Sequence, residues 1–266
     1  MISYINERTQ SYMETISRNQ SNVLTSLDSL RNEWPEYIRK TSGKVREIYE
    51  YNDILIIITT DQQSAFDRNL IPIPYKGKVL NLLSNWWFEQ TKHIVPNAFI
   101  QSSHPNVTIA NKCHIFPIEF IVRGYITGTT ATSMWTNYNN GIRNYCGHIL
   151  PENLRKNQKL EHILLTPTTK SEDHDVLTSE EEIITSNILS KEEYNTCTEY
   201  AYRLFQYGTK ICQEKGLILV DTKYEFGYDR KNGCIRVVDE IHTPDSSRFW
   251  MLDTYQQHFD ANEVSI

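Results

Sequence analysis

The sequence predicts an α+β fold in two parts, an antiparallel β-sheet part followed by a larger part of mixed helices and strands. Strand patterns dominate before Phe120, whereas helical periodicity and helix-capping motifs join the strands after it. The length of 266 residues, at about 150 residues per domain, also allows two domains. We therefore expect a helical extension at 1–35, a β-rich part at 36–120 and an α+β part at 121–266.

The first predicted elements are a short helix and a β-hairpin. Apolar residues at helical spacing predict a helix at 21–31, and Pro35 follows its end. Residues 43–50 predict a polar strand, and the β-branched residues at 54–60 predict a buried one. The polar turn at 51–53 would join the two strands as a hairpin.

The middle of the chain predicts a loop, a long helix and three strands. The loop is expected at 61–69 and the helix at 79–94, and the strands are expected at 107–109, 113–116 and 119–125. The helix carries large apolar side chains on one stripe, which we expect to be buried. The stripe consists of Val79, Leu82, Leu83, Trp86 and Trp87.

The C-terminal part combines capped helices with a hairpin. Two capping boxes, Ser179-x-x-Glu182 and Ser190-x-x-Glu193, each predict the start of a helix. The second helix would end at Gly216, because glycine tolerates the left-handed conformation that follows many helices. Strands at 217–227 and 234–240 would flank a turn.

Composition limits the class of protein. The charge balance of 27 basic against 33 acidic residues gives −6, which argues against a general nucleic-acid binder. Five cysteines occur singly, as in reduced proteins. The chain shows neither the ~20-residue apolar run of a membrane helix nor a signal-peptide pattern at its start. We therefore expect a cytoplasmic protein that binds neither membranes nor nucleic acid; a homo-oligomer is possible.

The familiar catalytic motifs are absent from the sequence. It contains no phosphate-binding P-loop, dinucleotide-binding glycine motif, zinc-protease motif or nucleophile elbow. Histidines and cysteines are not clustered, which argues against a structural zinc site. Any chemistry must therefore come from carboxylates, lysines and arginines.

Asp221, Lys223 and Glu225 stand at alternate positions of a predicted strand. A strand has a side-chain period of 2, so the three lie on one face. The strand begins with an apolar run, which favours a strand that starts buried and emerges into a cleft. A solvated face of an edge strand is the alternative.

Asp239 and Glu240 end the next predicted strand. Carboxylates from neighbouring strands suit Mg²⁺, which binds through one or two carboxylates and substrate phosphates. A plain two-residue turn at Asn232-Gly233 would place Asp239 opposite Phe226, on the wrong face to share a metal with Glu225. Metal binding by both residues therefore predicts a three- or five-residue loop, or a bulge.

Several basic residues could hold phosphate groups. Lys44 and Arg46 would point to one side of the first strand of the hairpin and could hold a polyphosphate; the alternative, which this segment alone favours, is an ordinary basic edge strand. Arg123 and Arg248 stand near hydroxyl-rich loops, where a guanidinium group can bind phosphate through two hydrogen bonds. Self-capped turns are the alternative there. The charged loop at 166–175 is either a substrate lid or a solvated loop.

Taken in order, these segments resemble the SAICAR synthetase family, from about Gly43 to Trp250. Any single motif is weak, but the ordered set is highly specific. The motifs are Gly43-Lys-Val-Arg46, Ser64-Ala-Phe-Asp67, Lys76-Gly-Lys78, Pro117-Ile-Glu119, Val122-Arg-Gly-Tyr-Ile-Thr-Gly128, Thr166-Pro-x-Thr-Lys170, His174-Asp175, Asp221-Thr-Lys-x-Glu-Phe-Gly227 and Asp239-Glu-x-x-Thr-Pro-Asp-Ser-Ser-Arg-Phe-Trp250.

The resemblance implies an ATP-dependent ligase of de novo purine biosynthesis. It would join L-aspartate to carboxyaminoimidazole ribonucleotide (CAIR) through an acyl phosphate, giving SAICAR, ADP and phosphate. The implied fold has two lobes, a kinase-like antiparallel N-terminal lobe and a larger mixed α/β C-terminal lobe, with ATP in the cleft between them and Mg²⁺ on the ATP. A small-molecule kinase and a catalytically inactive nucleotide-binding regulator are the alternatives.

The resemblance also implies roles for individual residues, each carried over by its place in a motif. The catalytic group around the imidazole would be Asp175, Asp221 and Lys223. ATP would contact Lys44, Arg46, Glu119 and Glu225. The CAIR substrate would contact Asp67, Arg123, Thr129, Ser247 and Arg248. The Mg²⁺ ligands would be Glu225 and Asp239.

Overall fold

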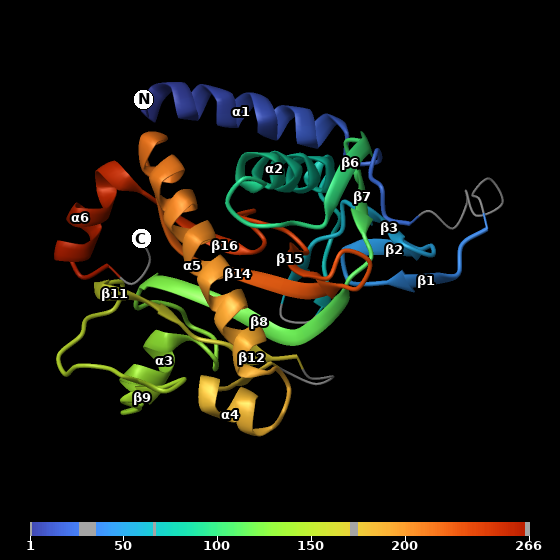
Figure 1. Cartoon of the computed structure of the whole chain (residues 1–266). Coiled ribbons are helices and arrows are strands. Elements are labelled where there is room, and N and C mark those ends of the chain that lie inside the picture. The colour runs from blue at the N-terminus through green and yellow to red at the C-terminus, as the bar shows by residue number, and fades with distance from the viewer. Residues whose placement is uncertain (1, 27–35, 66–67, 171–174, 264–266) are drawn as a thin grey trace. The chain divides into compact units, whose positions relative to one another are not determined.

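The computed structural model describes residues 2–26, 36–65, 68–170 and 175–263 (Figure 1). These residues form two compact units, which are described separately. The first unit comprises 1–86 with 98–112, and the second comprises 87–97 with 113–266. The domain boundaries expected at 35 and 120 stay predictions; residue 120 lies inside a continuous strand, β8 (His114–Tyr125).

The first unit is built on a five-stranded antiparallel sheet. Its strand order is β1-β2-β3-β7-β6. The strands are β1 (Arg39–Ser42), β2 (Arg46–Glu50), β3 (Ile54–Thr59), β6 (Phe99–His104) and β7 (Val107–Asn111). The β2–β3 hairpin matches the expected one, and a short pair, β4 (Ser64–Ala65) and β5 (Arg68–Asn69), lies within the expected loop.

The helix expected at 21–31 is wrong where the structure describes it. Residues 22–26 have no regular structure, residues 27–31 lie outside the described part, and a helix forms instead at α1 (Ile2–Arg18). The reason is a tertiary contact. The backbone N–H of Leu24 donates to the Asp61 carboxylate at 2.9 Å, and the Asp61 N–H donates to the Leu24 carbonyl at 2.7 Å. This pairing replaces the local helical hydrogen bonds.

The long helix α2 (Lys76–Thr91) forms close to the expected range, but its buried face was partly mispredicted. Val79, Leu82 and Trp86 are exposed, at 57%, 50% and 44%, whereas Leu80, Trp87 and Phe88 are buried. The inner face is partly polar. Asn81 Oδ1 accepts hydrogen bonds from Thr59 and Thr108 on the sheet. A buried amide network of this kind leaves no signal in hydrophobic periodicity.

The second unit contains a seven-stranded antiparallel sheet. Its main path is β13-β12-β8-β14-β15, with β11 paired to β8 and β16 paired to β14. The strands besides β8 are β11 (Lys159–Leu165), β12 (Thr168–Thr169), β13 (Val176–Leu177), β14 (Leu217–Asp229), β15 (Cys234–Val238) and β16 (Ser247–Met251). The strands expected at 113–116 and 119–125 are therefore one strand, and its pairing to β14 shifts register near Pro117, which has no N–H to donate.

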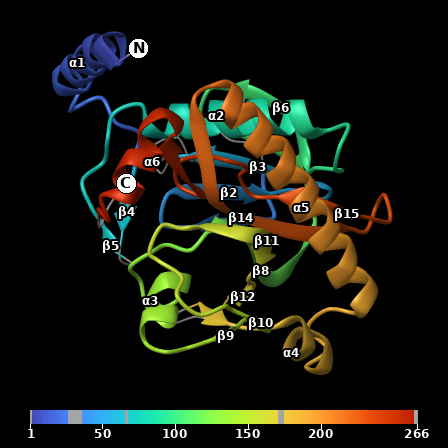
Figure 2. The same ribbon diagram turned by 90° about the vertical axis from the view of Figure 1, so that its left-hand side faces the viewer.

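One long helix crosses the sheet of the second unit (Figure 1, Figure 2). This helix, α5 (Lys191–Glu214), begins at the expected capping box of Ser190 and Glu193, and Gly216 follows it with φ of +75°. Its buried residues include Ala201, Leu204 and Phe205. The other expected capping box starts α4 (Glu180–Thr185). Each cap contributes on the order of 1 kcal/mol to its helix.

The remaining elements of the second unit are short. They are α3 (Met134–Asn139), β9 (Asn144–Tyr145), β10 (His148–Ile149) and α6 (Leu252–Asp260). In the part of the chain that the structure describes, none of the helices has the length and apolar character needed to cross a lipid bilayer.

Candidate active site

Three neighbouring strands bring an arginine, an aspartate and a second arginine into one row. In the sheet of the second unit, Asp221 on β14 is paired with Arg123 on β8 and with Arg248 on β16. Directly opposed residues of neighbouring strands present their side chains on the same face. The order of the strands therefore places two cations beside one carboxylate.

The side chains of this row are hydrogen-bonded to each other. Arg248 donates from Nε to Asp221 Oδ1 at 2.8 Å and from Nη2 to Oδ2 at 2.6 Å, and Arg123 Nη1 donates to Oδ2 at 3.0 Å. Arg123 also donates from Nε to Thr166 Oγ1 at 2.9 Å. The side chains of Arg123 and Asp221 are each 6% exposed, whereas Arg248 is 43% exposed. One carboxylate thus holds two guanidinium groups, and the row keeps a net positive charge.

A cavity of about 250 Å³ opens over this row. Its lining includes Arg123, Asp221, Lys223, Ser247 and Arg248. Thr222 and Ser247 also line this cavity, and their hydroxyl oxygens lie 2.7 Å apart. An excess of cations beside hydroxyl groups is the chemistry that binds a phosphate group.

Gly128 allows the chain to pass close to the second arginine. Its φ is +103°, and a Cβ atom there would lie 2.3 Å from Ser133 Cβ and 3.1 Å from Arg248 Nη1. A side chain at this position would therefore displace Ser133 and crowd the guanidinium group.

Next to the arginine row, one lysine lies among three carboxylates. Lys223 Nζ donates to Glu119 Oε1 and to Glu225 Oε1, each at 2.8 Å, and lies 3.8 Å from Asp239 Oδ2. Burial opposes the charged form of Lys223, but the negative charges of Glu225, Asp239 and Glu119 outweigh it and raise the pKa of the lysine. Lys223 is therefore a fixed cation at neutral pH.

The carboxylates of this cluster have further partners. Lys170 donates to Glu225 Oε2, and Thr168 Oγ1 donates to Glu119 Oε2 at 3.1 Å. The side chains of Glu119 and Glu225 are nearly buried, at 10% and 9% exposed. Three acids and two lysines form one connected group. A metal cation could take the place of one lysine ammonium group and bind the same carboxylate oxygens.

Asp239 reaches this cluster by an unexpected route. The loop between β14 and β15 holds four residues, 230–233, and Glu225 is paired with Val238. A three- or five-residue loop, or a bulge, is the expectation for a shared metal; the loop length is wrong, and the β14–β15 pairing runs from Glu225 to Asp229 without a register shift. β15 ends at Val238, and Asp239 takes a φ of +59°, which turns its carboxylate toward Lys223. The left-handed conformation of Asp239 at the strand end places its carboxylate on the face of Glu225, as a loop of odd length would have done.

The donor set fits a magnesium ion better than a transition metal. Glu225 and Asp239 offer only carboxylate oxygens, which are the protein ligands of Mg²⁺, and phosphate oxygens would complete its shell. Among the residues that the structure describes, no group of three or more His, Cys, Asp or Glu is arranged to hold a metal ion by itself. The two carboxylates are therefore suited to a metal that arrives with a phosphate ligand.

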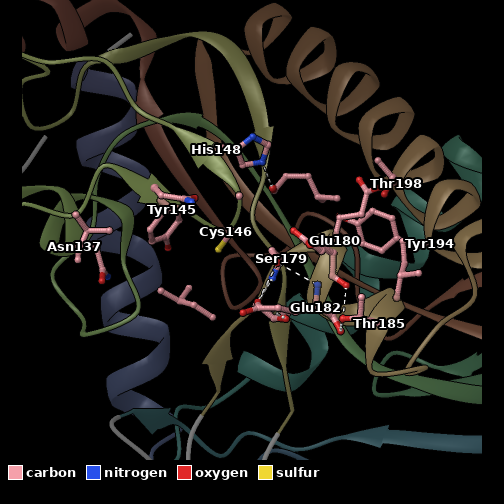
Figure 3. Close-up of a pocket in the computed structure, with 18 of the residues that line it drawn as sticks. Asn137, Tyr145, Cys146, His148, Ser179, Glu180, Glu182, Thr185, Tyr194 and Thr198 are labelled. Carbon is pink, nitrogen blue, oxygen red and sulfur yellow. Dashed lines mark hydrogen bonds between the residues drawn. The ribbon is translucent and has the colours of Figure 1, made fainter.

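A larger hollow of about 940 Å³ lies elsewhere in the second unit, between the β9–β10 hairpin and α4 (Figure 3). Among the described residues, its lining includes Tyr145, His148, Tyr194 and the acidic first turn of α4, but no lysine or arginine and none of the predicted site residues. Without a cation, this hollow does not suit phosphorylated substrates.

The sequence of this chain matches one family over most of its length. Residues 39–265 match the family model described as SAICAR synthetase. The chain belongs to the SAICAR synthetase family. It is 53% identical over 239 residues to the phosphoribosylaminoimidazole-succinocarboxamide synthase, chloroplastic, of Vigna aconitifolia, covering 90% of this chain and 70% of that protein. It is 56% identical over 225 residues to the corresponding synthase of Legionella pneumophila (strain Lens), covering 85% and 72%.

Solved structures of the SAICAR synthetase family share the fold. A SAICAR-synthase from Saccharomyces cerevisiae complexed with SAICAR aligns with a TM-score of 0.74 at 29% identity, covering 90% of this chain and 87% of that one. A type-2 SAICAR synthetase in complex with ADP aligns with a TM-score of 0.69 at 25% identity, covering 85% and 92%. The expected enzyme class, an ATP-dependent ligase of purine biosynthesis, is therefore confirmed, as is a mixed α/β fold with antiparallel sheets.

Five other residues are predicted from the SAICAR synthetase resemblance: Lys44, Arg46, Thr129, Asp175 and Asp67. Lys44 and Arg46 are in the first unit, Lys44 exposed in the turn after β1 and Arg46 at the start of β2. The expectation that both lie on one strand is wrong, because the Gly43 N–H donates to the Arg46 carbonyl at 2.8 Å and closes a turn there. Thr129 and Asp175 are exposed. Asp67 lies outside the described residues.

Three supporting residues were not among those predicted to act. Thr166, Thr168 and Lys170 hold Arg123, Glu119 and Glu225 in place. The segment Thr166-Pro-Thr-Thr-Lys170 was the available signal, since it places three hydroxyls and a cation within five residues.

Proposed function

We propose that this chain forms the amide bond of SAICAR from CAIR and L-aspartate with the hydrolysis of ATP to ADP. The observation that carries the proposal is the assembly of Arg123, Asp221 and Arg248 beside the Lys223 carboxylate cluster on one sheet, in a chain of the SAICAR synthetase family. The CAIR carboxylate would take the γ-phosphoryl group of ATP to form an acyl phosphate. The aspartate amine would then form the C–N bond as the C–O bond to phosphate breaks.

In this proposal the arginine row binds the phosphate of the ribonucleotide. Arg248 is the more exposed guanidinium group and lines the cavity, whereas Arg123 is buried and held by Thr166. Asp221 has both oxygens engaged by arginines, so we assign it to orienting them rather than to proton transfer. Ser247 and Thr129 would add hydroxyl donors to the phosphate.

The carboxylate cluster serves ATP and its metal in the same proposal. Glu225 and Asp239 would hold Mg²⁺, which would neutralise charge on the phosphates. Lys223, a fixed cation, would lie against the anionic carboxylate or phosphoryl group and offset the repulsion between two anionic substrates. Glu119, Lys44 and Arg46 would contact ATP, and Asp175 and Asp67 would contact CAIR. Phosphoryl transfer needs alignment and charge stabilisation more than covalent chemistry by the protein.

The description of a kinase-like N-terminal lobe, a larger C-terminal lobe and ATP bound between them belongs to this proposal. It rests on the family resemblance. A cytoplasmic location is likewise a proposal; the similar synthases include bacterial ones, and one from a plant is named chloroplastic.

The test is the substrate dependence of ADP release by the purified chain. With ATP and Mg²⁺ present, ADP should form only when both CAIR and L-aspartate are supplied, and SAICAR should form in equal amount. ADP release with CAIR alone and a stable phosphorylated product would instead identify a small-molecule kinase. ATP binding without turnover under any of these conditions would identify a nucleotide-binding regulator.

A further inference from the structure

A fully buried histidine stands between the two ends of the candidate site. The segment 239–246, here called the site loop, joins β15 to β16; Asp239 is its first residue, and Arg248 lies just after it, within β16. His242 lies within this loop at 0% exposure, flanked by Ile241 and Thr243, which are also at 0%. The proposed chemistry does not use its imidazole.

The imidazole of His242 occupies a slot formed by three elements. Its Nε2 lies 2.5 Å from the hydroxyl oxygen of Tyr224 on β14, and its ring meets the Trp87 ring edge-on with centroids 4.6 Å apart. On the side of α5, a Cβ atom at residue 208 would lie 2.4 Å from His242 Cε1. The ring can therefore pack against the helix only because residue 208 is glycine. The slot is closed on all of these sides.

The slot lies on the face of the sheet opposite to the carboxylate cluster of the candidate site. Tyr224 alternates with Lys223 and Glu225 along β14, so its side chain points to the opposite face of the sheet. The site loop therefore carries Asp239 toward Lys223 on one face while His242 is held on the other. The buried His242 side chain therefore anchors the loop on the face of the sheet opposite to the charged cluster.

The two halves of the site loop are held differently. Near Arg248, the Lys223 N–H donates to the Ser246 carbonyl at 3.0 Å, and β16 pairs with β14. Near Asp239, the backbone takes two left-handed residues, with φ of +59° at Asp239 and +52° at His242. Side chains other than glycine rarely adopt this conformation unless the surrounding structure enforces it. The turn that begins at Asp239 is therefore enforced by the structure packed around it, which includes the buried side chain of His242.

We propose that His242 is a positioning residue, whose buried contact with Tyr224 sets the left-handed turn that aims Asp239 at Lys223 and the metal-bound phosphates. This inference rests on the proposed function and deepens it. It makes a selective claim: loss of the anchor should weaken the use of Mg²⁺ and ATP, which depend on Asp239, and should spare the ribonucleotide, which depends on Arg248.

The experiment compares His242→Leu with His242→Gln in the full chain. Leucine fills the slot without a hydrogen bond, whereas the glutamine amide can reach the Tyr224 hydroxyl. In the leucine variant, the Mg²⁺ concentration for half-maximal rate should rise roughly tenfold, the usual scale for losing a residue that orients a metal ligand. The KM for CAIR should stay within about twofold, because the hydrogen bonds that hold Arg248 remain. Glutamine should restore most of the Mg²⁺ response.

Two controls keep the result interpretable. Ile183→Ala removes a fully buried side chain from α4 and should lower the thermal midpoint without changing the Mg²⁺ response. Tyr224→Phe removes the same hydrogen bond with the ring kept, and it carries the test if His242→Leu does not fold. An Mg²⁺ response unchanged in both anchor variants, or a KM for CAIR that rises in parallel with it, would overturn the inference. Failure of the proposed function is a separate result, because the unmodified chain would then form no SAICAR.

Discussion

The Asp239 carboxylate lies 3.8 Å from the Lys223 ammonium group, although the strand register would send residue 239 to the other face of the sheet. Val238 is paired with Glu225, so a regular continuation of β15 would oppose Asp239 to Tyr224 and direct it away from the cluster. The positive φ of Asp239 reverses this direction. The position of one carboxylate that we propose as a metal ligand therefore depends on a single backbone conformation.

Replacement of Asp239 by asparagine should abolish turnover with little loss of stability. The change removes the negative charge that would face the metal but keeps the volume, and asparagine tolerates a left-handed backbone as well as aspartate does. The rate of SAICAR formation and the thermal midpoint measure the two effects. Asp253→Asn, in the exposed first turn of α6, is the matched control for charge. Near-normal turnover by Asp239→Asn would remove the metal assignment.

The sequence predicts much of this site because the site depends on strand periodicity. Asp221, Lys223 and Glu225 were placed on one face from alternation alone, and the contacts of Lys223 with Glu225 agree with that. The neighbours of Asp221 were beyond such reasoning, since Arg123 and Arg248 meet it only because β8 and β16 flank β14. Strand order is a long-range property that no local pattern encodes.

The failures of sequence reasoning also have physical causes. The inner face of α2 is partly polar, so hydrophobic periodicity selected the exposed Trp86. Residues near Leu24 form backbone hydrogen bonds with Asp61, which local helix propensity does not include. Asp239 turns toward the site through a rare φ value. In each case the tertiary structure overrides the conformation or burial that the local sequence favours.

Arg248→Ala should raise the KM for the ribonucleotide and leave Mg²⁺ dependence nearly unchanged. The variant loses a charge-assisted contact worth about 1.5–3 kcal/mol, which corresponds to a KM increase of roughly 10- to 150-fold. Initial rates against CAIR concentration, with ATP and aspartate saturating, measure the change. The KM of Arg248→Lys should lie between those of the unmodified chain and the alanine variant, because lysine keeps the charge but cannot form two parallel hydrogen bonds to the phosphate. An unchanged KM in the alanine variant would contradict the phosphate assignment of the arginine row.

Gly208→Ala should destabilise the protein, although alanine normally favours a helix over glycine by up to about 1 kcal/mol. The added Cβ atom would lie 2.4 Å from His242 Cε1, and overpacking of this kind costs about 1–3 kcal/mol. Denaturant unfolding measures the free energy. In a His242→Ala background the obstructing ring is gone, so the same substitution should be neutral or stabilising. Equal costs in the two backgrounds would show that the ring and the helix do not compete for this space.

The buried histidine also predicts how stability depends on pH. Burial lowers the pKa of His242 to about 3, whereas the unfolded chain binds a proton near its usual 6.5. The unfolded state therefore takes up one more proton as the pH falls below 6.5, and the free energy of unfolding should decrease from there down to about pH 3. Between about pH 7.5 and pH 5 this single group should lower the free energy of unfolding by about 2 kcal/mol.

Urea unfolding at the two pH values measures this loss of stability, and the His242→Leu variant should lack the contribution of the histidine. Carboxylates with lowered pKa values, such as Asp229, lose their contribution mainly at more acidic pH, so this window isolates the histidine. A loss of equal size in the leucine variant would show that the imidazole of His242 is not buried in its neutral form.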